Sequence, residues 1–131
     1  MIGLDTNILL RLLVDDGSAD VGKARSWAAA QAAEGAEFYV DAVVLAEVAW
    51  VLESVFAYTR AEIAMALDAL LGNAAYRVEG HAAALAALAV FRSGNFDFSA
   101  CLIVARGQQA GCSATATLDK GIRKLAGATI I

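Results

Sequence analysis

Short runs of strand-forming residues alternate with longer segments of helical periodicity, and this alternation constrains the fold most strongly. The predicted strands are Met1–Leu4, Glu37–Val40, Tyr76–Val78, Ser113–Thr117 and Ala128–Ile131. The predicted helices, which are rich in Ala and Leu, are Thr6–Val14, Ala19–Glu34, Val43–Ala57, Arg60–Leu71, Glu79–Arg92, Phe98–Gln109 and Lys120–Leu125. Because strands joined through helices pair in parallel, we expect an α/β fold, an α/β/α sandwich with a central, mainly parallel sheet.

Size and composition indicate one packed domain. The chain has 131 residues, of which 60% are hydrophobic and 18% charged, and it contains no proline. This composition excludes a disordered chain, and no linker or repeat divides it, so we expect a single domain over residues 1–131. No apolar run has the length of a membrane span or of a signal-peptide core, so we expect a soluble cytoplasmic protein with no membrane partner.

The net charge and the cysteine content argue against some kinds of binding protein and metal site. A net charge of −4 argues against a protein that holds nucleic acid through bulk positive charge. It does not exclude chemistry on nucleic acid, because an enzyme that collects carboxylates around a divalent cation is acidic when the cation is left out of the count. Cys101 and Cys112 are predicted at opposite ends of one helix, about 16 Å apart, which is too far for a disulfide. With one histidine, these cysteines do not suit zinc.

Two carboxylates follow predicted strands and precede predicted helices. Asp5 ends the first strand, and Asp119 comes two residues after the fourth. In open α/β sheets, ligands bind outside the carboxyl ends of the strands, so both side chains are candidates for a shared cleft. Each of them, taken alone, could serve only as a helix N-cap.

A third carboxylate, Glu47, stands in the apolar segment AVVLAEVAWVL. Its neighbours one turn away are valines and Trp50, so we expect it on the apolar face of its helix. A lone carboxylate in that position is costly without a partner or a metal ion. An ion pair with a buried arginine is the alternative, but a shared divalent cation explains Asp5, Glu47 and Asp119 together.

The stretch NFDFSACLIVARGQQAGC is predicted to start a helix, with Asp97 as its N-cap. We expect this helix to lie beside the two strand-to-helix junctions at Asp5 and Asp119. A stripe facing inward is expected at Ala100, Ile103, Val104 and Gly107. Position 100 is where a fourth carboxylate would reach the same cleft, and the sequence places alanine there.

Four motifs, in this order and covering nearly the whole chain, resemble PIN-domain ribonucleases, specifically VapC-like toxins of type II toxin-antitoxin systems: LDTNILLR, AEVAWVL, DFSACLIVAR followed by AGC, and TATLDK. The resemblance places Asp5, Glu47 and Asp119 on three acidic positions of the family and Thr117 on the hydroxyl position two residues before the last acid. The fourth acid would make this chain read DFSDCLIV, but Ala100 stands there. Asp97 matches a commonly acidic position upstream and is expected to cap the helix rather than to substitute.

The resemblance implies an endoribonuclease that uses Mg²⁺ or Mn²⁺ and leaves 5′ phosphates, and hard oxygen ligands favour these ions. Asp5 and Asp119 are expected to bind the metal directly or through water, and Glu47 to orient the water or complete the ligands. Because Ala100 replaces one acid, we expect weak metal binding and little or no cleavage. Ala100 is either a natural loss or an introduced inactivating replacement, and the intact surrounding pattern favours the latter.

Other residues are expected to support the site. Asn7 is placed to hydrogen-bond Asp5 or a ligand water, although a helix-start Asn is equally often structural. Four cations could touch RNA phosphates, namely Arg11, Lys120, Arg123 and Lys124, although cations at helix ends are more often solvated.

The resemblance also implies partners and leaves alternatives. A homodimer and a cognate VapB-like antitoxin are expected, which suits a helix surface poor in charge, with DNA contacted only through the antitoxin. One alternative is a non-catalytic module that acts only by binding an antitoxin in a repressor complex. A phosphatase with an aspartate nucleophile is disfavoured, because LDTN lacks the second aspartate two residues on.

Overall fold

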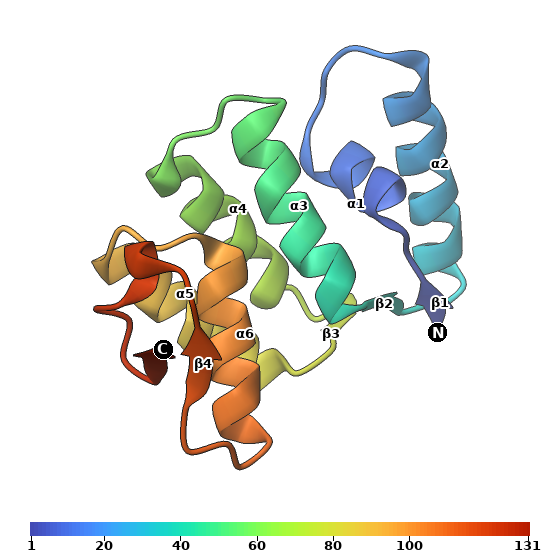
Figure 1. Ribbon diagram of the computed structural model, residues 1–131. Helices are drawn as coiled ribbons and strands as arrows, with labels where there is room; N and C mark the ends of the chain where they lie inside the picture. Colours follow the sequence, from blue (N-terminus) through green and yellow to red (C-terminus); the bar gives the residue numbers. More distant parts are fainter.

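A computed structural model describes residues 1–131 and confirms the α/β class with parallel strands (Figure 1). The strands are β1 (Ile2–Gly3), β2 (Phe38–Val40), β3 (Tyr76–Val78), β4 (Thr115–Thr117) and β5 (Ala128–Ile130). The helices are α1 (Thr6–Leu13), α2 (Ala19–Ala33), α3 (Ala42–Ser54), α4 (Arg60–Leu71), α5 (His81–Ser93) and α6 (Phe98–Gln109), together with the 3₁₀ turn η1 (Lys120–Ile122). None of these helices is both long and apolar enough to cross a membrane.

Three predicted helices differ from expectation at one end by two residues or more. The helix predicted over Val43–Ala57 is α3, which already ends at Ser54. The helix predicted over Glu79–Arg92 begins at His81, because Gly80 before it adopts a left-handed conformation with φ of 62°. The helix predicted over Lys120–Leu125 is only the 3₁₀ turn η1, in which the Asp119 side chain accepts a hydrogen bond from the Gly121 N–H at 2.8 Å. A side chain that bonds to the backbone two residues on favours a turn over a helix.

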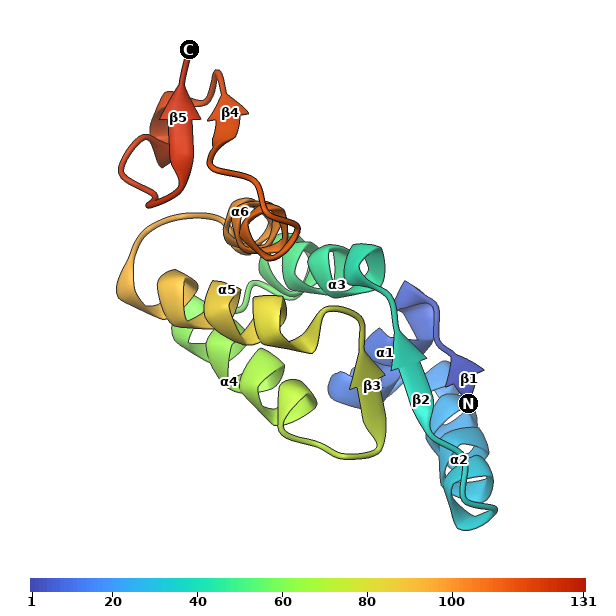
Figure 2. The ribbon, with the colours of Figure 1, turned by 90° about the horizontal axis from the view of Figure 1, so that it is seen from below.

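The five strands form two separate parallel sheets. The first has the order β1-β2-β3, with Gly3 opposite Tyr39 and Tyr39 opposite Arg77. The second holds β4 and β5, with Thr117 opposite Ile130. Figure 2 shows β4 and β5 on the far side of α6 from β1, β2 and β3. The strands that precede Asp5 and Asp119, β1 and β4, therefore lie in different sheets.

The two faces of the first sheet differ. Phe38 and Val40 are buried, and the Trp27 ring of α2 lies 5.8 Å from the Phe38 ring. Gly3 and Arg77 are exposed on the opposite face, since alternate residues of a strand point to opposite sides. The salt bridge between Arg77 and Glu37 lies near the strand starts. The α1 and α2 side of this sheet thus carries its apolar contacts.

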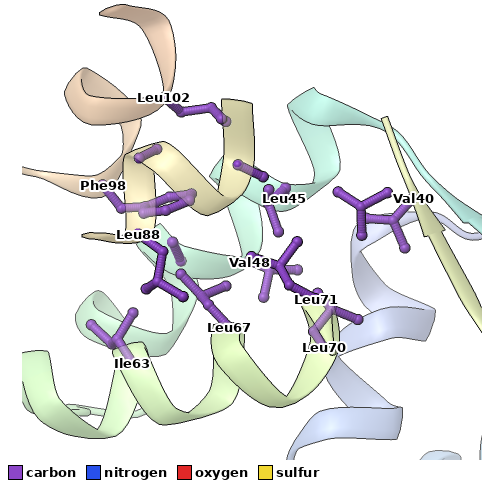
Figure 3. Close-up of a cluster of buried hydrophobic side chains, with 14 of the residues drawn as sticks. Val40, Leu45, Val48, Ile63, Leu67, Leu70, Leu71, Leu88, Phe98 and Leu102 are labelled. Atoms are coloured by element: carbon purple, nitrogen blue, oxygen red, sulfur yellow. The ribbon is translucent and has the colours of Figure 1, made fainter. Parts of the chain in front are cut away.

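The main core lies among α3, α4, α5 and α6, where aliphatic side chains from facing helices meet (Figure 3). Small residues of α5 allow close packing, since Ala84 and Ala87 are fully buried. The Phe91 and Phe98 rings meet edge to face at 5.9 Å. The largest fully buried side chains are Leu9, Leu45, Leu52, Leu67, Leu70, Val40 and Val48.

Candidate active site

Asp5 lies where β1 ends and α1 begins, and it caps that helix. Its Oδ1 accepts a hydrogen bond from the Ile8 N–H at 3.0 Å. The side chain is exposed, and Asp5 takes part in none of the four salt bridges of the structure. Oδ1 serves the cap, and Oδ2 has no partner within the chain, so the cap leaves one carboxylate oxygen available to a ligand.

A groove opens beside Asp5 along β1 and has a volume of about 770 Å³. Asn7 and Arg11 of α1 line it on the same side as Asp5. One face of α2 closes the other side with Asp20, Lys23, Ala24 and Trp27. The groove thus holds two carboxylates and two cations on an apolar floor. The α2 residues were not predicted, although their spacing of three and four residues marks one helix face.

Glu47 lies on the solvent side of α3, so the prediction that it occupies the apolar, buried face is wrong. Leu45, Val48 and Leu52 form the buried side, whereas Val43 and Trp50 flank Glu47 with exposed fractions of 64% and 63%. Glu47 makes no salt bridge and no side-chain hydrogen bond. Glu47 is exposed and unpaired rather than buried.

Ala100 sits in the first turn of α6, half-buried against the core. The predicted inward stripe is only partly correct, because Val104 is buried while Ile103 is 61% exposed. Asp97 occupies the N-cap position without a side-chain hydrogen bond. Asp97 lines a different cleft of about 400 Å³, together with Trp50 and Glu53, and Glu53 was not predicted as a site residue.

Asp119 follows β4 and is held by its own turn. Its backbone N–H donates to the Thr117 hydroxyl at 3.0 Å, so Thr117 helps to fix this turn. The side chain is exposed and unpaired by any cation. The neighbouring cations Lys120, Arg123 and Lys124 border a separate hollow beside the loop between α5 and α6, away from the Asp5 groove.

A PIN-domain family model matches residues 2–128. The chain belongs to the PIN-domain family. PIN domains are in general nucleases, so this family membership supports a nuclease function. No curated protein sequence matches the chain.

Within one copy of this PIN domain, the acidic residues of the family do not form one site. The structure contains no group of three or more His, Cys, Asp or Glu side chains that could hold a metal ion. Asp5 and Asp119 follow strands of different sheets, and α6 lies between those sheets (Figure 2). The carboxylates of Asp5, Glu47 and Asp119 have no cationic partners, and carboxylate oxygens are donors that suit a hard divalent cation. One copy of the chain, however, does not bring these three carboxylates together.

A charged cluster joins α6 of the PIN domain to the carboxyl ends of β2 and β3. Glu79 Oε1 accepts a hydrogen bond from the Ala42 N–H at 2.9 Å, and Glu79 Oε2 lies 3.8 Å from the Arg106 guanidinium. Burial, and then the nearby Glu79 and Asp41 carboxylates, raise the pKa of Tyr39. This cluster positions α3 and α6 on the sheet. His81 Nε2 lies 2.8 Å from the Leu71 carbonyl oxygen and so links the start of α5 to the end of α4.

Proposed function

We propose that this PIN domain is a Mg²⁺- or Mn²⁺-dependent endoribonuclease toxin of a VapC-like toxin-antitoxin pair, with cleavage weakened by Ala100. The observation that carries the proposal is the unpaired Asp5 carboxylate at the end of β1, which opens into a groove with Arg11 and Lys23. Cations in such a groove can hold phosphates beside a carboxylate-rich centre. Hydrolysis would add the hydroxide of water to phosphorus and its proton to the 3′ oxygen, leaving a 5′ phosphate.

The proposed need for a divalent metal ion rests on the negative charge of three carboxylates. Asp5, Glu47 and Asp119 are all exposed and unpaired, and hard cations select such oxygen donors. Loss of a fourth carboxylate at position 100 removes both a charge and an oxygen donor. We therefore expect the chain as it stands to bind metal weakly and to cleave slowly.

The test restores the missing acid. Ala100→Asp should produce Mg²⁺- or Mn²⁺-dependent cleavage of RNA, at least about tenfold above the unaltered chain, with 5′ phosphate ends and growth arrest on expression. Adding Asp5→Ala should abolish both effects. Ser99→Asp is the matched control, since it places the same charge one residue away. Absence of any gain in Ala100→Asp refutes the proposal.

A second function is favoured by one observation, namely that the acids of one copy form no metal-binding group. Under this proposal the domain is a non-catalytic module that binds a VapB-like antitoxin in a repressor complex and meets DNA only through that antitoxin. The exposed apolar side chains Val43, Trp50 and Met65 suit such a partner. Antitoxin binding without cleavage in Ala100→Asp would support this function, and homodimer formation in the cytoplasm belongs to both proposals.

A further inference from the structure

Half of the ten Lys and Arg side chains are engaged within the fold. Four of them, Arg25, Arg77, Arg92 and Arg106, form the salt bridges, and the Arg60 guanidinium lies over the Phe91 ring. The other half form no salt bridge, and every one of them lines one of two concave surfaces. Because a concave surface with unpaired cations concentrates anions, each of the two is a candidate binding site.

One of these surfaces is the groove beside β1, and the other is a hollow of about 670 Å³ beside the loop between α5 and α6. We call the second one the basic hollow, and its polar and aromatic lining consists of Lys120, Arg123, Lys124, Ser93, Asn95 and Phe96. No carboxylate lines it, whereas Asp5 and Asp20 line the groove beside β1. The basic hollow is therefore the more positive of the two surfaces.

The cations of the basic hollow stand on a turn that the core holds in place. Leu125 is buried in the main core, and Ile122 packs against it. The Leu125 N–H donates to the Ile122 carbonyl oxygen at 2.9 Å, which closes the turn. The side chains of Lys120, Arg123 and Lys124 are all exposed on this turn. Their backbone is thus fixed before any ligand binds, which lowers the entropy lost on binding.

The surrounding charge confines anion binding to such local patches. A net charge of −4 repels polyanions from most of the chain. Residues 115–131, in contrast, carry three cations and one carboxylate, Asp119. One oxygen of that carboxylate already accepts a hydrogen bond from the Gly121 N–H at 2.8 Å. The basic hollow is therefore a positive patch on an acidic protein.

An aromatic ring distinguishes the basic hollow from a simple anion site. Phe96 lines the hollow and is half-buried, so part of its side chain remains open to a ligand. The ring lies against the Gly94 backbone, since a Cβ at Gly94 would come within 2.8 Å of Phe96 Cε2. A fixed ring beside cations suits single-stranded nucleic acid, in which a base stacks on the ring while phosphates meet the cations. An acidic peptide supplies the charge but no base.

The basic hollow and the groove beside β1 lie apart. The cations of the hollow follow β4, and Figure 2 shows β4 and β5 on the far side of α6 from β1. Arg11 and Lys23 belong to the groove beside β1 and not to the hollow. A phosphate bound in the hollow is therefore held by a separate set of cations.

We propose that the basic hollow is a second binding site for single-stranded RNA, in which Lys120, Arg123 and Lys124 hold phosphates and Phe96 stacks on a base. The site captures the strand and takes no part in the chemical step. Its meaning as a substrate site rests on the proposed function, whereas RNA binding in the hollow does not require cleavage.

The salt dependence of binding tests the phosphate contacts. Arg123→Gln/Lys124→Gln removes two cations and leaves Lys120, the neighbour of Asp119, in place. The slope of log affinity against log salt should fall by about 1.4, since one phosphate contact of a single strand contributes about 0.7. The parent should therefore gain about 25-fold more affinity than this variant between about 1 M and about 0.1 M salt.

The matched control is Arg77→Gln/Arg92→Gln, which removes the same charge from two cations that are already paired with carboxylates. Fluorescence anisotropy with a labelled single-stranded RNA, in EDTA and with Ala100 unaltered, measures the slopes of all three chains. The control should keep the slope of the parent. An unchanged slope for Arg123→Gln/Lys124→Gln, or an equal change in the control, overturns the proposal.

The role of Phe96 separates RNA from other polyanions. Phe96→Leu keeps an apolar side chain but removes the ring, so RNA affinity should fall at least about fivefold with an unchanged salt slope. Inorganic polyphosphate and polyglutamate, measured as competitors, should bind Phe96→Leu and the parent equally, because neither has a base to stack. Urea unfolding checks that Phe96→Leu is folded. Unchanged RNA affinity in the folded variant would make the hollow a general anion site and overturn its assignment to RNA.

Kinetics separate this inference from the proposed function. In the Ala100→Asp background, Arg123→Gln/Lys124→Gln should raise KM and leave kcat unchanged, because a contact made equally in the ground state and the transition state contributes only to binding. A fall in kcat at unchanged KM overturns the capture role. An inactive Ala100→Asp chain refutes the proposed function instead, and the salt slopes of the chain with Ala100 still decide whether the hollow binds RNA.

Discussion

The Arg60 guanidinium stacks on the Phe91 ring and also bonds to the Phe91 backbone. Its Cζ lies 3.9 Å from the ring centroid, and Nη2 donates to the Phe91 carbonyl oxygen at 2.7 Å. Phe91 in turn meets the Phe98 ring edge to face. The start of α4 is thereby fixed to the end of α5 and to the first turn of α6, where Ala100 lies.

Removal of this contact should destabilise the fold. Arg60→Met keeps most of the apolar length but loses the charged donor and the stacking, so we expect the free energy of unfolding to fall by about 1–2 kcal/mol. Arg92→Met is the control, because Arg92 reaches only an exposed Asp68 at 3.7 Å and should change stability by less than about 0.5 kcal/mol. Urea unfolding measures both. Equal effects of the two variants would contradict the assigned role of Arg60.

The two roles of Asp5 can be separated by two substitutions. Asp5→Asn retains an oxygen for the Ile8 N–H, so stability should change by only a few tenths of a kcal/mol, whereas Asp5→Ala should cost about 1 kcal/mol. In the Ala100→Asp background both variants should lose RNA cleavage, because neither supplies a carboxylate. Urea unfolding and a cleavage assay give the two readouts. Full cleavage by Asp5→Asn would show that Asp5 is only a cap.

Local pattern was enough to predict the order of the elements. Several helices carry their own start signal, as Asp5 does for α1 and Asp119 for η1, and strand-like runs occur where β1 to β5 are found. Cap residues were identifiable because their bonds reach only two or three residues along the chain.

The positions of side chains and strands relative to distant parts of the chain could not be predicted from local pattern. In α3 the segment AVVLAEVAWVL is apolar on nearly every side, so periodicity could not show that Glu47 faces solvent beside Trp50. The pairing partner of β4 depends on tertiary packing, because a three-residue strand has too little sequence to specify its neighbour. The site residues were therefore easier to name than to place together.

The capping box of α4 should make stability depend on pH. Glu62 accepts a hydrogen bond from the Thr59 N–H, which lowers the pKa of the Glu62 carboxyl, helped by the Thr59 side chain. A lowered folded-state pKa means that this stabilisation is present above the ordinary value of 4.5 and is lost as pH falls through the folded value. The parent should therefore lose more stability on acidification than Glu62→Gln, which keeps an acceptor but no titrating carboxyl.

The measurement for Glu62 is the unfolding free energy by urea at neutral pH and below the ordinary glutamate value. Glu34→Gln is the matched control, since the Glu34 side chain is exposed and makes no hydrogen bond or salt bridge. The difference between parent and Glu62→Gln should shrink in acid, while that for Glu34→Gln should stay constant. If the difference in unfolding free energy from the parent stays constant with pH for both variants, the capping box does not contribute to the pH dependence of stability.

Lys23 should contribute to RNA binding through the groove beside β1. It lines that groove with Asp5 and Arg11 and forms no salt bridge, so its ammonium is available for a phosphate. Lys23→Gln should weaken binding of single-stranded RNA and reduce the slope of log affinity against log salt by about 0.7, the value for one lost phosphate contact. Arg77→Gln is the control, because Arg77 is already paired with Glu37. Fluorescence anisotropy over a salt series measures both slopes, and an unchanged slope for Lys23→Gln would place the RNA elsewhere on the domain.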